Sequence, residues 1–403
     1  MNTFMASGLG HRILEPPRPQ QREGGNADLP SGPRFRELRV VLVHDWLITL
    51  GGADRVLLAL HQVFPQAPVF VSLYDPSRLP EAFGRMQVRA SWLQRIPGAV
   101  QRHRLLVPVM PFAFGSLDLP DADVVLSSSH ACAKGVRVPP GAVHVCYCHT
   151  PMRYAWDLSA EYLQAVPVLA RPLARAALAW LRRWDRATTK NVHYLVANSR
   201  FVAERIRRHY QRESAVIYPP VDVDFFTPGG RTEEYFLVVS RLVPYKRVDL
   251  AVEAFNRLKR RLIVVGDGPE LPRLRAMAGP AVTFADEVGD AILRDLYRGC
   301  RALIFPGEED FGIVPVEAQA CGRPVIAYGR GGVLESVRPA VTGMFFGQQT
   351  ADALTAAVRA FRDETFDPAV IRAHAEQFSR QRFAHQIAEF VAEVAAHRGG
   401  TVT

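Results

Sequence analysis

The sequence predicts an α/β protein built from two doubly wound, Rossmann-like domains that face each other across a cleft. The chain has 403 residues, and at roughly 100–200 residues per domain two domains are expected. In the second half, short apolar runs alternate with helix-like segments, which is typical of a parallel sheet covered by helices on both faces. A stretch rich in Pro and Gly at 219–233 separates the halves and is interpreted as a linker.

Composition and charge narrow the class of protein. The chain has 49 Lys and Arg against 40 Asp and Glu, a net charge of +9, and 48% hydrophobic residues. These values indicate a soluble globular protein and exclude a wholly disordered chain, a collagen and a coiled coil. The positive charge fits nucleic acid, an anionic membrane surface or a phosphorylated substrate as partner. Nucleic acid is not expected, because the sequence contains no nucleic-acid-binding motif.

Cysteines and apolar segments bear on the compartment. Five cysteines without a framework spacing predict free thiols and a reducing compartment, for which the cytoplasm fits best. No run approaches about 18 uncharged apolar residues, and the start of the chain has no apolar signal-peptide core, so neither a membrane span nor a secretory signal is expected. Residues 1–36 are rich in Pro, Gly, Arg and Gln and are predicted to form a disordered tail.

The first domain is predicted over 37–218. Its first strand is the apolar run 38–43, and a loop that contains Gly51 and Gly52 leads into a helix. Apolar residues of this helix recur at the spacing of one buried face, namely Val56, Leu57, Leu60, Val63 and Phe64. Further strands are predicted at 69–73, 124–126, 143–148 and 194–197.

The second domain is predicted over 234–379. Its strands are predicted at 235–240, 261–266, 282–285, 302–305 and 324–328. Its helices are predicted at about 247–258, 270–277, 290–298 and 315–321. Domains of this kind bind ligands at the carboxyl ends of their strands. The last segment, 380–403, is predicted to form a C-terminal helix that packs back across the domains and carries Phe383, Ile387, Phe390 and Val394.

The most informative segment contains Glu309 and Glu317, with seven residues between them. The predicted turn from strand to helix falls within this spacing, on Phe311, Gly312, Ile313 and Val314. Backbone N–H groups at a helix start can hold a phosphate or a sugar hydroxyl, and Glu317 can accept hydrogen bonds from a ribose diol. Taken alone, two such glutamates are more often solvated surface acids.

Two cations and a histidine follow predicted strands. Arg241 and Lys246 are five residues apart, and a guanidinium fork with an ammonium can neutralise a departing diphosphate. As isolated residues, they could be ordinary surface cations. His149 stands at the carboxyl end of another strand, where it can hydrogen-bond a donor sugar or an acceptor hydroxyl.

Several metal and nucleotide motifs are weak or missing. A zinc site is the competing interpretation of His144, Cys146, Cys148 and His149, but strand alternation puts His149 on the opposite face from the other three. Asp121-Ala122-Asp123 has the form of a metal–nucleotide site but leads straight into a strand. No metal is therefore expected. Nucleotide hydrolysis and dinucleotide redox chemistry lack their glycine-rich motifs, and Gly51-Gly52 taken alone indicates only a turn.

Together these segments resemble the retaining nucleotide-sugar glycosyltransferases of family 4, which have the two-domain GT-B fold. The resemblance is carried by the spaced glutamates and by the residues after them, namely Ala318-Gln319-Ala320-Cys321-Gly322-Arg323-Pro324-Val325-Ile326-Ala327, then Gly331-Gly332, Glu335 and Thr342-Gly343. It extends over about 38–390 and is stronger in the second half.

The resemblance implies a role for each candidate residue. Glu309 would hold the donor sugar, Glu317 the ribose, and His149 the reacting end of the sugar. Arg241 and Lys246 would stabilise the departing diphosphate. The loop Gly51-Gly52 and the backbone of Phe311, Gly312, Ile313 and Val314 would bind the donor phosphates, Glu287 and Val288 fall in the loop that contacts the base, and the turn Gly266-Asp267-Gly268-Pro269 would be mainly structural.

The resemblance also implies the reaction and its partners. Transfer would proceed with retention by a front-face attack, without a metal or any cofactor besides the nucleoside diphosphate sugar. The segment 149–157 resembles bacterial mannosyltransferases of surface-polysaccharide assembly, which implies GDP-mannose as donor and a saccharide linked to polyprenyl diphosphate as acceptor. A UDP-sugar-dependent member of the same family is the main alternative, and a GT-B-fold epimerase or a phosphorylase-like enzyme is a further one.

Residues 171–190 predict a basic amphipathic helix. Its two sides are Arg171, Arg175, Arg182 and Arg186 on one, and Leu173, Ala177, Trp180, Leu181 and Trp184 on the other. Such a helix can lie peripherally on the anionic inner face of the plasma membrane. The alternative is that its apolar side packs into the first domain. His130 and Lys134 are further candidates for sugar or acceptor contact, with burial of His130 and exposure of Lys134 as the alternatives.

Overall fold

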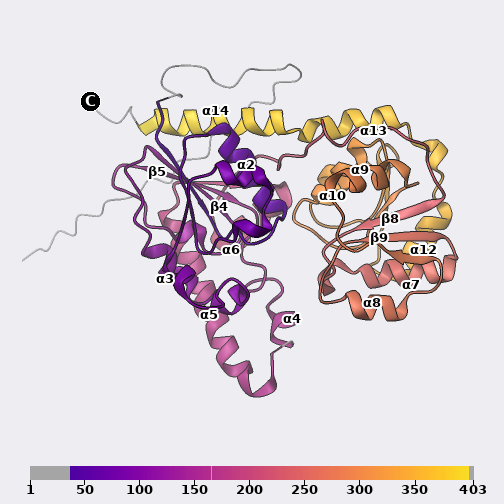
Figure 1. Cartoon of the computed structure of the whole chain (residues 1–403), viewed down its shortest axis with the longest axis horizontal. Coiled ribbons are helices and arrows are strands. Elements are labelled where there is room, and N and C mark those ends of the chain that lie inside the picture. Colours follow the sequence, from indigo (N-terminus) through magenta and orange to yellow (C-terminus); the bar gives the residue numbers. More distant parts are fainter. Residues whose placement is uncertain (1–36, 165, 399–403) are drawn as a thin grey trace, which may run out of the picture.

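The computed structural model describes residues 37–164 and 166–398 (Figure 1). Two parallel sheets, each covered by helices, follow one another along the chain, which confirms the predicted α/β class with two doubly wound domains. The predicted tail, 1–36, and the end of the last predicted segment, 399–403, lie outside the described residues. No helix of the described ranges is long and apolar enough to cross a membrane.

The first sheet has seven parallel strands in the order β3-β2-β1-β4-β5-β6-β7. The strands are β1 (Val40–His44), β2 (Val69–Val71), β3 (Val88–Ala90), β4 (Val124–Ser129), β5 (Val143–Cys148), β6 (Tyr194–Ala197) and β7 (Ala215–Val216). The helices are α2 (Gly52–Val63), α3 (Met110–Gly115), α4 (Ser159–Gln164), α5 (Arg171–Thr188) and α6 (Arg200–Tyr210). Short 3-10 helices are η1 (Pro76–Arg78), η2 (Glu81–Arg85), η3 (Trp92–Arg95), η4 (His103–Leu106), η5 (Ala133–Gly135), η6 (Val168–Ala170) and η7 (Thr189–Asn191).

The second sheet has six parallel strands in the order β10-β9-β8-β11-β12-β13. The strands are β8 (Tyr235–Val239), β9 (Arg261–Val265), β10 (Val282–Phe284), β11 (Leu303–Phe305), β12 (Val325–Tyr328) and β13 (Gly343–Phe346). The helices are α7 (Val248–Leu258), α8 (Leu271–Met277), α9 (Asp290–Gly299), α10 (Ile313–Ala320), α11 (Val333–Ser336), α12 (Ala351–Ala360), α13 (Pro368–Ala375) and α14 (Arg380–Arg398). The 3-10 helices are η8 (Pro244–Lys246), η9 (Asp363–Thr365) and η10 (Glu376–Phe378).

Strand β1 shows why the predicted strands read as unbroken apolar runs. Leu42 packs with Leu57 of α2 on one face of the sheet, whereas Val43 packs with Phe114 of α3 on the other face. A strand that is buried on both faces has no solvent-facing positions that would need polar residues. The helices on both sides of the sheet therefore follow from the same pattern that predicted the strand.

Several elements differ from the sequence-based expectation, among them three strands, one helix start and the helices α3, α4, α6, α11, α12 and α13, which were not predicted. The short strands β3, β7 and β13 were not predicted, because they have two to four residues each and too little pattern to distinguish them from loops. Helix α10 begins at Ile313, two residues before the expected start. Gly312 precedes it with a φ of 86°, a backbone conformation that glycine adopts without strain, and Pro315 is tolerated in the first turn.

Helix α14 starts beside the second domain and runs onto the first (Figure 1). Its buried residues, including Phe383, Ile387, Phe390 and Val394, belong to the core of the first domain. The Phe383 ring lies 5.8 Å from the Tyr147 ring of β5 and the Phe390 ring 6.1 Å from the Tyr194 ring of β6, measured between centroids. The end of the chain thus contributes to the fold of its first half.

The amphipathic helix predicted at 171–190 is α5, and its apolar side is divided. Leu181 is buried in the first domain, whereas Leu173 is 75% and Trp180 is 38% exposed. In Figure 1, α4 and the start of α5 project away from the first sheet. We call the exposed apolar residues on and beside this projection the arm surface; they are Leu105, Phe112, Val168, Leu169, Leu173 and Trp180. Packing into the domain therefore accounts for only part of the apolar side.

Candidate active site

The loops that follow the parallel strands bring the two domains together. Gly52 lies so close to α10 that a Cβ atom on it would be 3.2 Å from Ile313 Cδ1. Thr150, the second residue after β5, donates a hydrogen bond of 3.2 Å to Asp310 Oδ1. Most of the residues singled out by the sequence therefore lie along one boundary, at the carboxyl ends of both sheets.

Lys246 and Glu309 form an ion pair between Nζ and Oε1. Their side chains are 16% and 22% exposed, so the pair is accessible from one side. Gly307 permits this approach, because a Cβ atom there would lie 3.0 Å from Lys246 Cα. The Glu309 backbone is held in turn by the Gly332 N–H at 2.8 Å. An ammonium that can meet phosphate oxygens thus stands beside a carboxylate that can accept sugar hydroxyls.

Arg241 is exposed on the loop after β8 and makes no ion pair with any described carboxylate. The turn 266–269 packs closely against this loop. Cβ atoms on Gly266 and Gly268 would lie 2.0 Å from Ser240 O and 2.3 Å from Leu242 O. Only glycine allows such contacts, so this turn positions the loop that carries the arginine.

The start of α10 presents backbone and not aromatic surface. Phe311 is 2% exposed and packs in the core of the second domain against Tyr218 and Phe378. Only its main chain is therefore available to a ligand, and its side chain has a packing role. Ile313 and Val314 are half-buried beside the same core.

Glu317 lies inside the protein, 6% exposed, on α10. Its Oε2 accepts a hydrogen bond of 2.8 Å from the Tyr297 hydroxyl, and Oε1 has no hydrogen-bond donor among the described residues. Burial raises the pKa of Glu317, and the nearby Arg55 guanidinium opposes that shift. Arg55 belongs to the first domain and donates to Asp290 Oδ1 at 2.9 Å across the boundary.

Glu287 and Val288 lie in the loop between β10 and α9, shortly before Asp290, the partner of Arg55. Strand β10 is at the edge of its sheet and is separated from β8 by β9. Glu287 is exposed, and Val288 packs against the core of the second domain. The structure therefore brings Glu309, Lys246, Gly52 and α10 together, and Val288 packs in the same core cluster as Ile313 and Val314 of α10.

His149 follows β5 and is 8% exposed. Its Nε2 is 2.7 Å from Ser128 Oγ, and its ring lies edge-on to the Tyr147 ring with centroids 5.2 Å apart. Burial lowers the pKa of His149 well below its usual value, and the nearby His130 and His44 act in the same direction. The imidazole is therefore neutral at physiological pH and can accept a hydrogen bond.

Asp310 was not predicted, yet it makes the densest set of polar contacts between the domains. Its carboxylate accepts from Thr150 and pairs with Arg153 at 3.2 Å and Arg205 at 2.6 Å. Glu335 forms a second connection, because it accepts from the backbone N–H groups of Arg200 and Phe201 at the start of α6 and from the Tyr218 hydroxyl, at 2.8, 2.9 and 3.0 Å. In the sequence, only the position of Asp310 between Glu309 and Phe311 could have indicated that it lies near the site.

Lys134 does not lie in the site and is not exposed, which corrects the alternatives considered for it. It is 1% exposed and forms an ion pair with Asp185 of α5, which is fully buried. His130 is part-buried, and its Nδ1 is 3.0 Å from Asp45 Oδ2. Burial alone would lower the pKa of His130, but Asp45 raises it. The His130 ring lies close to that of His149, with ring centroids 6.3 Å apart.

The residues of the weaker motifs have other partners. Asp123 accepts from the Arg39 backbone and guanidinium at 2.9 Å each. His144 bonds Ser127 Oγ through Nε2 at 2.9 Å. The five cysteines are all buried and free, and burial raises the pKa of the Cys146 thiol to about 11. No group of three or more His, Cys, Asp or Glu within 37–164 and 166–398 is arranged to hold a metal ion.

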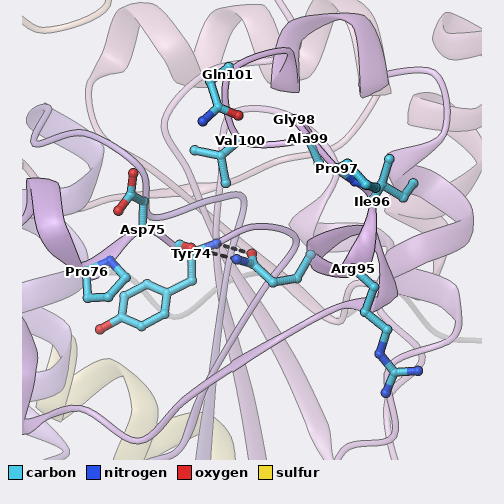
Figure 2. Close-up of a pocket in the computed structure, with 11 residues that line it drawn as sticks. Tyr74, Asp75, Pro76, Arg95, Ile96, Pro97, Gly98, Ala99, Val100 and Gln101 are labelled. Carbon is cyan, nitrogen blue, oxygen red and sulfur yellow. Dashed lines mark hydrogen bonds between the residues drawn. The ribbon is translucent and has the colours of Figure 1, made fainter.

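A cavity of about 400 Å³ lies at the carboxyl ends of β2 and β3 in the first sheet, between the loops that follow these strands (Figure 2). Its walls come from 74–76 and 94–101. The Gln94 amide fastens these two walls, because it accepts from the Tyr74 N–H at 2.9 Å and donates to the Tyr74 carbonyl at 3.0 Å. Sequence reasoning missed this pocket, since no residue pattern marks where two loops diverge.

Comparison with known proteins assigns the chain to a family. A model described as Glycosyltransferase Family 4 matches residues 50–225, and one described as Glycosyl transferases group 1 matches residues 224–383. A D-inositol 3-phosphate glycosyltransferase from Geodermatophilus obscurus is 32% identical over 337 residues, which cover 71% of this chain and 74% of that protein. A protein of the same name from Gordonia bronchialis is 32% identical over 223 residues, 46% of this chain and 49% of that protein.

Solved structures share the fold. HepE of Anabaena in complex with UDP and glucose matches with a TM-score of 0.67 and 19% identity, over 88% of this chain and 99% of that one. Sucrose-phosphate synthase from Thermosynechococcus elongatus matches with a TM-score of 0.68 and 19% identity, over 89% of this chain and 100% of that one. The chain is therefore a glycosyltransferase that belongs to family 4 and has the two-domain GT-B fold.

Proposed function

We propose that this glycosyltransferase moves a hexose, with mannose from GDP-mannose as the favoured donor, to a saccharide acceptor carried on a lipid diphosphate. The observation that carries the proposal is the Lys246–Glu309 ion pair at the boundary of the domains. Lys246 and Arg241 supply positive charge for a diphosphate, and Glu309 supplies acceptors for sugar hydroxyls. Glu317 Oε1 would receive the ribose, and His149 the reacting end of the sugar.

The proposed reaction retains the configuration of the sugar and needs no metal. Cleavage of the anomeric bond leaves positive charge on the sugar and adds negative charge to the departing diphosphate. Arg241 and Lys246 would stabilise that negative charge in place of a metal ion. The acceptor hydroxyl would then attack from the face that the diphosphate leaves, assisted by one of its oxygens. Contacts of Asp310 with the first domain would keep water from the reacting atoms.

The nucleotide tests the donor. In titration calorimetry without metal, GDP should bind the purified protein about tenfold more tightly than UDP, the magnitude of one net hydrogen bond to the base. Addition of magnesium should leave both affinities unchanged. A preference for UDP would overturn GDP-mannose but keep the transferase chemistry, and it is the specific alternative, since HepE is a related fold with bound UDP. Binding of neither nucleotide would contradict the proposed function itself.

The acceptor side supports a lipid-linked substrate and surface-polysaccharide assembly as the pathway. The arm surface exposes Leu169 at 98% and Leu173 at 75%, and Phe112 stacks on Trp180 with centroids 5.7 Å apart. None of the five arginines of α5 has a carboxylate partner among the described residues, because its one acid, Asp185, is paired with Lys134. Apolar side chains beside unpaired arginines are the combination that binds an anionic bilayer surface. The enzyme would thus act peripherally on the cytoplasmic side of the membrane.

Replacing two exposed arginines of α5 should weaken membrane binding. The double variant Arg175→Gln/Arg183→Gln should bind phosphatidylglycerol vesicles roughly 30-fold more weakly in a sedimentation assay, since each arginine near the surface contributes about 1 kcal/mol. A control variant, Arg257→Gln/Arg273→Gln, loses the same charge from exposed ion pairs of the second domain and should bind as the wild type does. Equal losses in both variants would indicate net charge alone and would contradict the arm surface as the contact.

A further inference from the structure

Four buried polar side chains form one continuous hydrogen-bonded chain that ends at His149. Asp54 Oδ1 lies 3.1 Å from His44 Nε2, and His44 Nδ1 lies 3.1 Å from Ser128 Oγ. Ser128 Oγ lies 2.7 Å from His149 Nε2. None of the four is more than 8% exposed. The other Asp54 oxygen, Oδ2, accepts from the Gly51 N–H at 2.7 Å.

The sheet topology explains how these residues meet. Strands β1, β4 and β5 are neighbours, and His44 at the end of β1 is the register partner of Ser128 in β4. His149 follows the last residue of β5, and its backbone N–H donates to Ser129 O at 2.9 Å. Asp54 reaches the chain from the first turn of α2.

The direction of the hydrogen bonds follows from which atoms can donate. A carboxylate only accepts, so the proton between Asp54 and His44 belongs to His44 Nε2. If His44 carries no second proton, its Nδ1 accepts and the Ser128 hydroxyl donates to it. The Ser128 oxygen in turn accepts from His149, which must carry its proton on Nε2. His149 Nδ1 is left with a lone pair and without a partner among the described residues.

We propose that Asp54, His44 and Ser128 are positioning residues that hold His149 in the Nε2–H tautomer, so that Nδ1 accepts a hydrogen bond from a hydroxyl of the transferred sugar. The identity of that hydroxyl rests on the proposed function. We call the hydrogen-bonded series from Asp54 to His149 the relay. The lone pair of His149 Nδ1 would repel a carboxylate placed where the sugar hydroxyl binds. The relay therefore favours a neutral hexose and disfavours a hexuronic acid as donor. Because Asp54 also binds the Gly51 N–H, the glycine loop and the orientation of His149 are linked.

A second serine–histidine pair provides a matched control in the same strands. Ser127 Oγ bonds His144 Nε2 at 2.9 Å, and both residues are fully buried. Ser127 precedes Ser128 in β4, so its side chain points to the opposite face of the sheet. Ser127→Ala therefore removes a buried hydrogen bond of the same type without touching the chain to His149.

The experiment combines nitrogen NMR of the histidine rings with kinetics. In the wild type without ligand, ¹⁵N-histidine spectra should show His149 as the Nε2–H tautomer, and in Ser128→Ala the ring should no longer be held in it. The kcat of transfer should fall about 10- to 100-fold in Ser128→Ala, less than the loss of a group that contacts the reacting atoms, with the donor KM within about twofold. Ser127→Ala should transfer as the wild type does, and Ser128→Thr, which keeps the hydroxyl, should restore most of the rate.

Each outcome of these experiments supports or contradicts the proposed relay. An Nδ1–H tautomer in the wild type would overturn it, as would a Ser128→Ala variant with the tautomer and kcat of the wild type. If Ser128→Ala does not fold, the tautomer of His149 in the wild type and the transfer rate of Ser128→Thr still test the relay. A relay that is present by NMR in a protein that transfers no hexose from any nucleotide sugar would instead contradict the proposed function and leave the tautomer assignment standing.

Discussion

Replacing Glu309 with alanine should lower the rate of hexose transfer about a hundred- to a thousandfold while the protein stays folded. The carboxylate is 22% exposed and its only ion-pair partner among the described residues is Lys246, so its loss leaves no buried charge behind. GDP should bind with unchanged or higher affinity, because Lys246 no longer has to leave Glu309 to meet the diphosphate. Initial rates with radiolabelled donor, a melting curve and GDP calorimetry measure the three effects separately.

The neighbouring Glu308 provides the control for this variant. Its side chain makes no ion pair within the described residues, and its main-chain carbonyl accepts from Arg153 at 3.4 Å. Glu308→Ala changes the net charge equally, one residue away, and should transfer within about threefold of the wild-type rate. Near-normal turnover in Glu309→Ala would remove Glu309 from the donor site. A loss of equal size in both variants would point to the local charge instead of to a contact with the sugar.

The predictable part of the fold is the part buried on two faces. The runs at 143–148 and 194–197 coincide with β5 and β6, because both faces of those strands are covered and every position is buried. Strand β3 has the opposite character, since Arg89 in its middle is exposed at the edge of the sheet. A three-residue strand at the edge of a sheet does not need a run of apolar residues. The pairing of β3 with β2 is decided by tertiary contacts.

The candidate site was predictable where its residues share a local motif and not where they meet across the sheet. Glu309, Glu317 and Gly312 stand at fixed spacing on one strand–helix unit, so their type and order could be recognised. The relay to His149 depends on strand order, which the sequence does not state. His44 and Ser128 are 84 residues apart and become neighbours only because β4 lies beside β1. The partners of Asp310 likewise come from the other domain.

The buried pair of Lys134 and Asp185 should be the most destabilising site to disrupt in the first domain. Lys134 Nζ also donates to Ala131 O at 2.8 Å, and Asp185 Oδ2 accepts from Trp156 Nε1 at 2.7 Å and the Tyr210 hydroxyl at 2.9 Å. Burial alone would lower the pKa of Lys134, but Asp185 raises it above the usual value. Lys134→Met leaves a carboxylate buried without its cation and should reduce the free energy of unfolding by about 3–5 kcal/mol.

Tryptophan fluorescence can follow this loss in one domain, because all five tryptophans lie between positions 46 and 184. Urea unfolding should therefore report the first domain, with the midpoint lowered and the slope unchanged. The double variant Lys134→Met/Asp185→Leu should recover part of the loss, since neither charge is then left unpaired. Arg207→Met breaks a pair with Glu213 whose side chains are 61% and 57% exposed, and should cost at most about 1 kcal/mol. A Lys134→Met effect no larger than that would mean that water reaches Asp185 and that the ion pair does not hold α5 to the domain.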